Sequence, residues 1–321
     1  MNPTPNDDRR RLMVRCAWLY HESGLTQEEI AGRLGVSRST VSRALSQAAR
    51  EGIVEVVITE PYPEALRLET VLTERLGVAA VVGMVGPGED PGEAAGRAAA
   101  RRLEAIVTPG DVSVAIGWGR TLSRMIPFLR RRKTRRVRIV GAIGHSVAAY
   151  GLAVGAVVRD VGAAFGAETH VLPAPLYSPG RGLTDALTQN VAVAETLEMA
   201  RRADVVFTSI GRAESSNPLV AEGMLTPDAM AELLSRGAVG DLLANFFDPE
   251  GRPLVVENFV PLGLGLEDLR AARRVVAMAC GPERVPAVLG AVAGDYVSEL
   301  VLDSITAEAL LAATGPGQPD S

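Results

Sequence analysis

The chain has 321 residues, 47% of them hydrophobic, and a formal net charge of −5. This length accommodates a small domain together with a larger one that has a sizeable core. The net negative charge excludes a protein that coats nucleic acid through its overall charge, so any DNA binding must depend on a local basic patch. The two cysteines, Cys16 and Cys280, do not indicate a disulfide framework. From this cysteine usage we expect a protein of the reducing cytoplasm. No apolar run approaches the roughly 20 residues that span a bilayer, so we expect no membrane contact.

The first predicted elements are helices within residues 10–50. A helix over 10–23 has Val14, Ala17 and Trp18 on one face, which we expect to pack against the next two helices. In those two helices, Thr26 and Glu29 have the spacing of a capping box. Gly35 then stands where a tight turn requires positive φ, and Ser37 caps the second helix. The pattern is that of a helix-turn-helix, which places its second helix in the DNA major groove.

The second of these helices has arginines and hydroxyl residues on its outward side. Arginine forms paired hydrogen bonds with guanine, and hydroxyl groups reach phosphates or base edges. Residues 33–50 contain four arginines and no acidic residue. The alternative is an ordinary helical hairpin with solvated arginines. The predicted DNA-binding residues are Thr26, Gln27, Ser37, Arg38, Ser39, Thr40, Ser42 and Arg43.

A domain boundary is predicted near residue 60, so that residues 1–60 form a DNA-binding domain and 61–321 a second domain for effector binding and oligomerisation. A short strand is expected over 53–58, and Pro61 and Pro63 mark the boundary. A helix is predicted over 64–76, with Leu68 and Leu72 at helical spacing. We expect this helix to link the two domains and to pack against the same helix of a second subunit.

From residue 79 onward, predicted strands and helices alternate. The strands are β-branched and lack clean polar alternation, which favours a parallel sheet covered on both faces. The fold class is therefore α/β: a small all-α domain followed by a large, doubly wound, mostly parallel domain. The expected strands are 79–84, 112–116, 137–142, 168–172, 205–210, 254–256, 275–279 and 300–302, and the expected helices 91–106, 121–132, 148–165, 185–202, 227–235, 285–293 and 306–313.

The best candidate for ligand binding is the loop Gly117-Trp-Gly-Arg-Thr121. It follows a strand and opens a helix, a setting in which backbone amides converge on an anion. Arg120 and Thr121 add a cation and a hydroxyl donor, which suits a phosphate or a polyol oxygen. A tight turn with Trp118 packed inside is the alternative. The predicted effector-binding residues of this loop are Gly117, Trp118, Gly119, Arg120 and Thr121.

Loops after other strands add further candidates, because ligands of such folds bind at the carboxyl ends of strands. His145 and Ser146 follow the next strand, with packing or capping as the alternative role for the histidine. Arg212 is a charge partner for an anion, and Arg284 begins a helix facing the same crevice. Asp241, in Gly-Ala-Val-Gly-Asp, suits sugar hydroxyls, with capping of a following Leu-Leu-Ala helix as its alternative.

Catalytic motifs are not found in the sequence. There is no Gly-x-Ser-x-Gly elbow, no clustered metal-ligand spacing and no Walker lysine, and we expect no cofactor and no metal ion. A Schiff base would depend on Lys133, the only lysine. This lysine belongs to the basic run Arg130–Arg136, which we expect to end a helix in a solvated turn or to add to a positive surface.

The chain resembles the SorC family of transcriptional regulators between residues 10 and 313. The resemblance is carried by Gly24-Leu-Thr-Gln-Glu-Glu-Ile-Ala, by Gly-Trp-Gly-Arg-Thr at 117–121, by Leu172-Pro-Ala-Pro175, by Gly-Ala-Val-Gly-Asp at 237–241, by Val276-Ala-Met-Ala-Cys-Gly and by Leu302-Asp-Ser-Ile-Thr-Ala-Glu308. It implies an effector domain similar to sugar-phosphate isomerases, with catalysis lost, and assembly as dimers or tetramers. It also implies control of operator binding by a phosphorylated sugar or related polyol. Where family members commonly have lysine, this chain has Arg284, which keeps the charge but adds a rigid guanidinium fork.

We therefore predict a DNA-binding transcriptional regulator, a homo-oligomer whose operator binding responds to a carbohydrate or sugar-phosphate effector. One alternative is a sugar-phosphate isomerase or deaminase fused to a DNA-binding module, with Asp241 as its general base. Another is a constitutive DNA-binding scaffold with a vestigial pocket.

Overall fold

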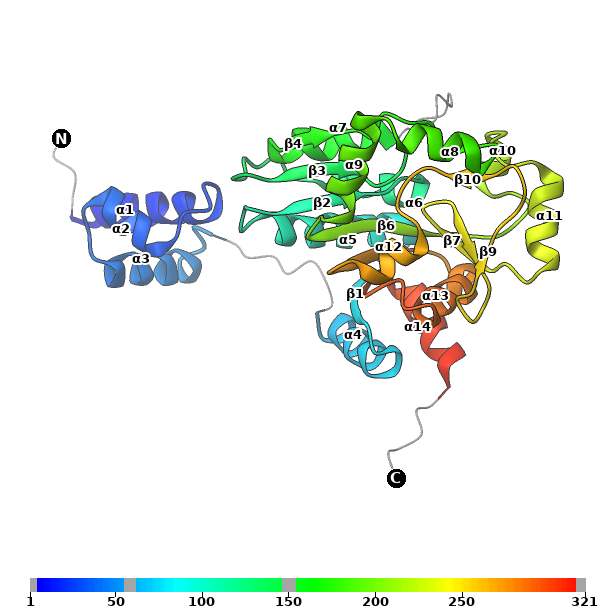
Figure 1. The fold of residues 1–321 in the computed structure, drawn as a ribbon. Helices are drawn as coiled ribbons and strands as arrows, with labels where there is room; N and C mark the ends of the chain where they lie inside the picture. Colours follow the sequence, from blue (N-terminus) through cyan, green and yellow to red (C-terminus); the bar gives the residue numbers. More distant parts are fainter. Residues whose placement is uncertain (1–4, 55–61, 146–153, 316–321) are drawn as a thin grey trace. The chain divides into compact units, whose positions relative to one another are not determined.

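The computed structural model describes residues 5–54, 62–145 and 154–315. The chain divides into two compact units, residues 1–60 and 61–321. Each unit has its own hydrophobic core, and Figure 1 traces the elements of each in chain order.

The first unit is a bundle of three helices: α1 (Pro5–His21), α2 (Gln27–Leu34) and α3 (Arg38–Arg50). Its core contains Met13, Cys16, Ala17, Leu19, Ile30, Ala31, Val41, Ala44 and Ala48. The face predicted for the first helix was wrong by part of a turn, because Val14 and Trp18 are 47% and 61% exposed. Only Ala17 of that predicted trio is buried.

Local signals fixed the junction between α2 and α3 as predicted. The amide of Glu29 donates to Thr26 Oγ1 (3.3 Å), and the amide of Thr26 donates to Glu29 Oε2 (2.8 Å), which completes the capping box. Gly35 has φ +67° at the end of α2. Ser37 Oγ accepts the amide of Thr40 (3.2 Å) and so caps α3. The strand expected over 53–58 is not formed by residues 53 and 54, which lie in a bend; 55–58 fall outside the described residues.

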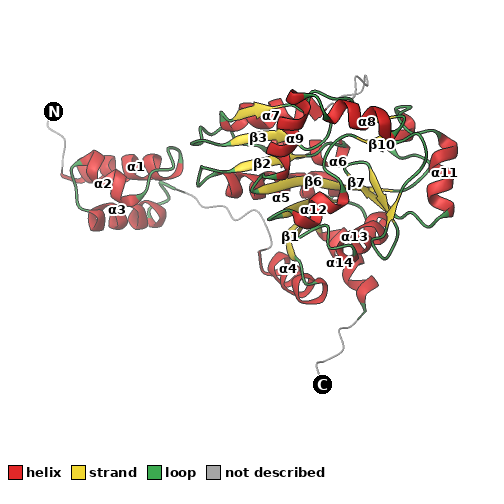
Figure 2. Ribbon diagram, viewed as in Figure 1, coloured by secondary structure: helices red, strands yellow, loops and turns green. Residues whose placement is uncertain are grey.

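The second unit is built on a sheet of seven parallel strands in the order β1-β12-β11-β6-β2-β3-β4. The strands are β1 (Ala79–Gly83), β2 (Ser113–Ile116), β3 (Arg138–Gly141), β4 (Glu168–His170), β6 (Val205–Arg212), β11 (Val275–Ala279) and β12 (Glu299–Asp303). Figure 2 shows this sheet with helices packed along it. All five residues of β11 and of β12 are buried, as expected for central strands covered on both faces. The predicted α/β class is confirmed.

Helices connect and cover these strands. They are α4 (Tyr62–Leu76), α5 (Pro91–Val107), α7 (Val154–Phe165), α8 (Arg181–Thr188), α9 (Val191–Arg201), α10 (Pro218–Ala221), α11 (Pro227–Ser235), α12 (Leu266–Ala271), α13 (Val285–Ala293) and α14 (Ser304–Thr314). Leu68 and Leu72 of α4 are fully buried, and α4 packs on β1 and α14 of the same chain. These two leucines are therefore not available to a second subunit, contrary to the expectation for this helix.

One predicted helix is replaced by other structures, and the alternative role considered for Asp241 is excluded. Residues 121–132 form only the short α6 (Arg120–Ser123), the 3₁₀ turn η1 (Ile126–Phe128) and a loop, because Pro127 interrupts the helical hydrogen bonds. Asp241 does not cap a Leu-Leu-Ala helix, because these residues belong to a hairpin of β7 (Gly240–Leu242) and β8 (Asn245–Phe247). With β9 (Pro253–Leu254), this hairpin extends β6 by antiparallel pairing, and β5 (Tyr177–Ser178) pairs with β10 (Val260–Pro261) elsewhere. The single helix predicted over 185–202 is divided between α8 and α9 at Asn190, which caps α9.

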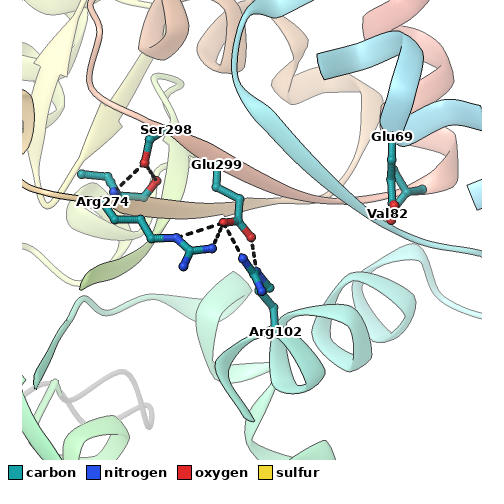
Figure 3. Close-up of polar contacts among 7 residues, drawn as sticks. Glu69, Val82, Arg102, Arg274, Ser298 and Glu299 are labelled. Carbon is teal, nitrogen blue, oxygen red and sulfur yellow. Dashed lines mark hydrogen bonds and ion pairs between the residues drawn. The ribbon is translucent and has the colours of Figure 1, made fainter. Parts of the chain in front are cut away.

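A buried carboxylate joins three elements at the amino edge of the sheet. Glu299, the first residue of β12, has a side chain that is only 3% exposed. It accepts from Arg102 of α5 (Nη2 to Oε2, 3.0 Å) and from Arg274, next to β11 (Nε to Oε2, 3.1 Å), as Figure 3 shows. In the same view, the amide of Val82 in β1 donates to Glu69 of α4 (2.8 Å). These bonds tie helices to strands far apart in the sequence.

Candidate ligand cavity and nucleic-acid interface

A polar cavity opens at the carboxyl edge of the parallel sheet. It lies at the ends of the neighbouring strands β2 and β6. From β2 the chain continues to β3 on one side of this pair, and after β6 the next parallel strand is β11, on the other side. Such a switch point separates the loops of adjacent strands and so creates a crevice. The lining residues are Trp118, Gly119, Arg120, Thr121, Ser209, Ile210, Gly211, Arg212, Glu214, Asn217, Pro218, Leu219, Asp241, Leu243 and Arg284.

The loop after β2 forms one wall of the cavity. Gly119 has φ +117° and precedes α6 without any side-chain cap. Trp118 and Thr121 are buried, whereas Arg120 is exposed and has no ion pair with any described residue. Four of the five residues predicted in this loop line the cavity. Gly117 does not; a Cβ there would lie 2.4 Å from Thr208 Oγ1, so this glycine allows β2 and β6 to approach.

Arg212 and Glu214 form an ion pair inside the cavity wall, just after β6. Their side chains are 34% and 31% exposed, so both charges reach the cavity while remaining partly shielded from solvent. Asn217 holds this segment, because its Nδ2 donates to the carbonyl of Arg212 (2.7 Å). The arginine predicted here to meet an anion already has an internal carboxylate partner.

Asp241, in β7, is 7% exposed and lies against Gly211, where a Cβ would be 2.0 Å from its Oδ1. The carboxylate accepts the amide of Ala244 (Oδ2, 3.1 Å) and lies at the 3.5 Å limit of a bond from Asn217 Nδ2. Burial raises the pKa of Asp241 to about 6, although these two donors and the charge of Arg284 lower it. This acid is therefore poised to change its protonation state when a ligand adds or removes a hydrogen-bond donor.

The turn after Asp241 is conformationally strained. Leu243 and Ala244 have φ of +51° and +63°, a left-handed conformation that costs residues other than glycine about 1–2 kcal/mol each. Asn245 Nδ2 donates to the carbonyls of Leu242 (3.2 Å) and Leu243 (2.9 Å), and so fixes the turn. Such conformations cluster at ligand sites because the surrounding structure must hold them in place.

Arg284, the last residue of η2 (Pro282–Arg284), also lines the cavity. Its Nη1 donates to Glu283 Oε1 (2.8 Å) and to the carbonyl of Cys280. Its Nε is buried and has no hydrogen-bond partner among the described residues. A buried guanidinium donor without a partner is uncommon in folded proteins. Burial also raises the pKa of the Cys280 thiol, which argues against a reactive thiolate here.

Seven of the ten predicted effector residues thus meet around one cavity: Trp118, Gly119, Arg120, Thr121, Arg212, Asp241 and Arg284. His145 does not line it; the histidine is exposed, pairs through its backbone with Pro175, and places Nδ1 3.4 Å from the carbonyl of Leu172. Ser146 lies outside the described residues.

Sequence reasoning missed Ser209, Glu214, Asn217 and Leu243, which also line the cavity. The Asn217-Pro218 pair is a readable helix-start signal, and Asn217 does cap α10 by accepting the amide of Leu219 (2.9 Å). Leu243 gave no signal, because nothing in its identity indicates a left-handed turn.

A second cavity is lined mainly by apolar residues of β8, β9 and the 255–267 segment. We favour the first cavity as the ligand site because three arginines and two carboxylates reach it, and convergent polar groups are what orient a ligand.

In the first unit, the predicted DNA-binding residues lie together at the start of α3 and of α2. Ser37, Arg38, Ser39 and Arg43 are exposed, and Arg43 Nε donates to the carbonyl of Ser39 (3.3 Å). Arg38 makes only a long contact with Glu28 (3.9 Å), in which both side chains are more than 70% exposed. Such a pair contributes little, so both arginines are available to a partner.

Within residues 5–54, 62–145 and 154–315, no helix is long and apolar enough to cross a membrane. No three histidine, cysteine or acidic side chains within the same ranges lie close enough together to hold a metal ion.

A helix-turn-helix unit joined to an α/β unit with a polar cavity defines a ligand-responsive DNA-binding protein. Residues 60–312 match the family model described as "Putative sugar-binding domain", and residues 12–68 match the Crp-like helix-turn-helix domain. The chain therefore belongs to the family of sugar-binding transcriptional regulators.

Relatives extend over nearly the whole chain. It is 30% identical to the transcriptional regulator LsrR of Escherichia coli, over 93% of this chain and 94% of that protein. It is 27% identical to the deoxyribonucleoside regulator of Bacillus subtilis, over 95% of this chain and 98% of that protein. The full-length sorbitol operon regulator SorC of Klebsiella pneumoniae has a similar structure, with a TM-score of 0.72 and 29% identity, covering 96% of this chain and 99% of that one. The predicted family is confirmed.

Proposed function

We propose that this protein binds operator DNA through α3 and that a carbohydrate effector with an anionic group, held in the cavity at β2 and β6, changes operator occupancy. The observation that carries the effector assignment is the meeting of Arg120, Asp241 and Arg284 around one cavity, with a buried Nε on Arg284 that has no hydrogen-bond partner among the described residues. Guanidinium donors suit a phosphate or carboxylate, and a carboxylate acceptor suits sugar hydroxyls.

The DNA assignment rests on Arg38, Ser39 and Arg43, which are exposed at the amino end of a capped helix. The relatives named above are transcriptional regulators, and their names point to a sorbitol operon and to deoxyribonucleosides. These names guide the ligand classes to be tested: pentose phosphates, hexose phosphates, polyol phosphates and their unphosphorylated forms.

The test measures binding of the full chain to its own upstream promoter fragment while these compounds are added singly. An effector must bind one conformation more tightly than another, so it changes the dissociation constant of the DNA complex. It also raises the melting temperature of the protein by mass action. Replacement of Arg284 by glutamine should abolish the response to a phosphorylated effector, while DNA binding without effector remains. A compound that changes DNA binding equally in the Arg284→Gln variant contradicts the assignment of this cavity.

We further infer that the cavity binds its ligand without a reaction. Asp241 has the raised pKa that suits a general base, but no histidine or lysine is among the residues that line the cavity. Turnover assays on pentose and hexose phosphates, with isomer and ammonia detection, separate this inference from an isomerase or deaminase. Measurable turnover that is lost in Asp241→Asn would favour the enzyme.

We also propose that the protein acts as a homo-oligomer, because a helix-turn-helix reads two half-sites with two copies of its second helix. Light scattering of the purified chain, with and without DNA, tests this assembly. A monomer that binds promoter DNA with full affinity would contradict it.

A further inference from the structure

Positive charge in the second unit is concentrated in one short segment. Residues 130–138 contain seven arginine or lysine side chains and no acidic residue, whereas the rest of 61–321 contains 18 basic and 30 acidic residues. Like charges at this density repel one another. They must therefore either be paired with nearby acidic side chains or be available to bind an anionic partner.

The backbone of this segment is fixed to its surroundings. It is a loop between η1 and β3 rather than the end of a helix. The amides of Arg132 and Thr134 donate to the carbonyls of Ala164 (2.7 Å) and Phe165 (3.0 Å) at the end of α7, and the carbonyl of Arg135 accepts an amide from the turn before β2 (2.9 Å). The loop is therefore a preformed scaffold for its side chains.

Most of the charges on this scaffold are not neutralised. Arg136 pairs with Asp111 and Arg138 pairs with Glu168 (3.5 Å). The remaining cations are exposed and have no ion pair with an acidic side chain of the described residues: Arg130, Arg131, Arg132, Lys133 and Arg135. We call these five residues the basic loop.

The basic loop lies at the edge of the sheet opposite the ligand cavity. It immediately precedes β3, so it belongs to the amino edge, whereas the cavity lies at the carboxyl ends of β2 and β6. None of its five residues lines that cavity, and its charge is therefore not needed to hold the effector.

We propose that the basic loop binds the phosphate backbone of duplex DNA, as a second, sequence-independent contact in addition to α3. This inference rests on the proposed DNA binding. Guanidinium forks match phosphate oxygens, and duplex DNA presents one negative charge for about every 1.7 Å of its axis. The six residues 130–135 reach at most about 20 Å, enough to meet several phosphates. The contact adds affinity to every sequence and leaves base selection to α3.

The experiment compares the full-length chain with the double variant Arg131→Gln/Arg135→Gln, whose two side chains make no described hydrogen bond. Binding is measured as a function of salt concentration on two duplexes, the upstream promoter fragment and a random-sequence duplex of equal length. Each lost phosphate contact lowers the slope of log affinity against log salt by about 0.9. We expect the slope to fall by about 1.8 on both duplexes, and affinity at low salt to fall roughly tenfold on both.

The control is Arg181→Gln/Arg236→Gln, which removes the same charge from two exposed arginines outside the loop; Arg236, unlike the loop residues, pairs with Glu232 and donates to the carbonyl of Val255. The control should keep the wild-type slope. An unchanged salt slope in the basic-loop variant overturns the proposal. An equal decrease of the slope in the control variant also overturns it, because the decrease would then come from net charge alone. If the proposed function itself is wrong, the wild-type chain will not prefer promoter DNA over the random duplex, which is a different result. Thermal unfolding of each variant verifies that it is folded.

Discussion

At the scale of single residues, Asp241 connects the chemistry of the cavity to the stability of the protein. Its carboxyl is buried against Gly211 and accepts the amide of Ala244, which lies in a strained turn. With the pKa raised to about 6, the folded state holds a proton over a pH range in which the unfolded chain has already released it. Deprotonation of this one group thus opposes folding, and a hydroxyl-bearing ligand that donates to the carboxylate would offset that cost.

We predict that Asp241→Asn changes how stability depends on pH. Between pH ~4 and pH ~6 the native state binds more protons at Asp241 than the unfolded state does, so the free energy of unfolding falls as pH rises. The fall amounts to on the order of 3 kcal/mol in total, and Asp241 causes no further change above that range. Asparagine does not titrate, so the Asp241→Asn variant lacks this pH-dependent loss of stability. Urea unfolding at pH 4, 5 and 7.5 should therefore show that the variant gains stability relative to the wild type as pH rises.

The exposed Asp185→Asn serves as the control and should follow the wild-type curve. If the difference between Asp241→Asn and the wild type stayed constant across pH, the carboxyl would not titrate in this range and the role given to its burial would be wrong.

At the scale of elements, α2 and α3 illustrate how local signals build a recognition surface. The capping box at Thr26, the left-handed Gly35 and the Ser37 cap are each satisfied by neighbours within a few residues. Consequently the exposed arginines of α3 are presented from a helix whose start is fixed. The arrangement separates two functions: buried Val41 and Ala44 hold the helix, while Arg43 projects from it.

For Arg43→Ala we expect specific binding to promoter DNA to weaken by about 1–3 kcal/mol if its guanidinium meets a base edge. Binding to random duplex should weaken much less, because a base contact contributes only where the base is present. Competition assays at fixed salt measure both. Arg33→Ala, an exposed arginine at the end of α2, is the matched control and should leave the ratio of the two affinities unchanged. Equal losses for both duplexes would assign Arg43 to the phosphate backbone instead.

At the scale of the whole molecule, Glu299 shows how the second unit is held together. The carboxylate joins α5, which follows β1, to Arg274 at the start of β11, although these segments are separated by more than half of the chain (Figure 3). Its side chain is 3% exposed, while those of Arg102 and Arg274 are 29% and 34% exposed. Removal of the acid would leave two partly buried cations facing each other without compensation.

Glu299→Gln should therefore destabilise the second unit by about 2–4 kcal/mol, less than the range for fully buried pairs because both arginines reach solvent. Glu198→Gln removes an exposed partner of Arg202 and should change stability by less than about 1 kcal/mol. Denaturant unfolding followed by a signal from the second unit measures both. A loss for Glu299→Gln no greater than that for the control would mean that the cluster is solvated rather than structural.

Several features could be predicted from the sequence because their causes are local. A cap, a turn glycine and the periodicity of apolar residues act over a few positions, so the three helices at the front and the strands Ala79–Gly83 and Val275–Ala279 were located closely. The rule that ligands bind at the carboxyl ends of parallel strands, together with the family resemblance, also brought Arg120, Asp241 and Arg284 into one candidate list.

Only the tertiary structure could decide what depends on partners distant in the chain. The hairpin after Asp241 forms because β7 pairs with the end of β6, about 30 residues earlier in the chain, and this pairing overrides the helical propensity of Leu-Leu-Ala. Distant parts of the chain also determine three features of the site: the Nε of Arg284 without a described partner, the Glu214 carboxylate paired with Arg212, and the position of His145 outside the cavity. Sequence by itself determined the helix-turn-helix and the mostly parallel α/β class of the second unit, since these follow from short-range patterning. Which side chains share the cavity, and which cations of the basic loop are left unpaired, was decided by packing, because charges and hydrogen bonds are satisfied by whatever the fold brings near.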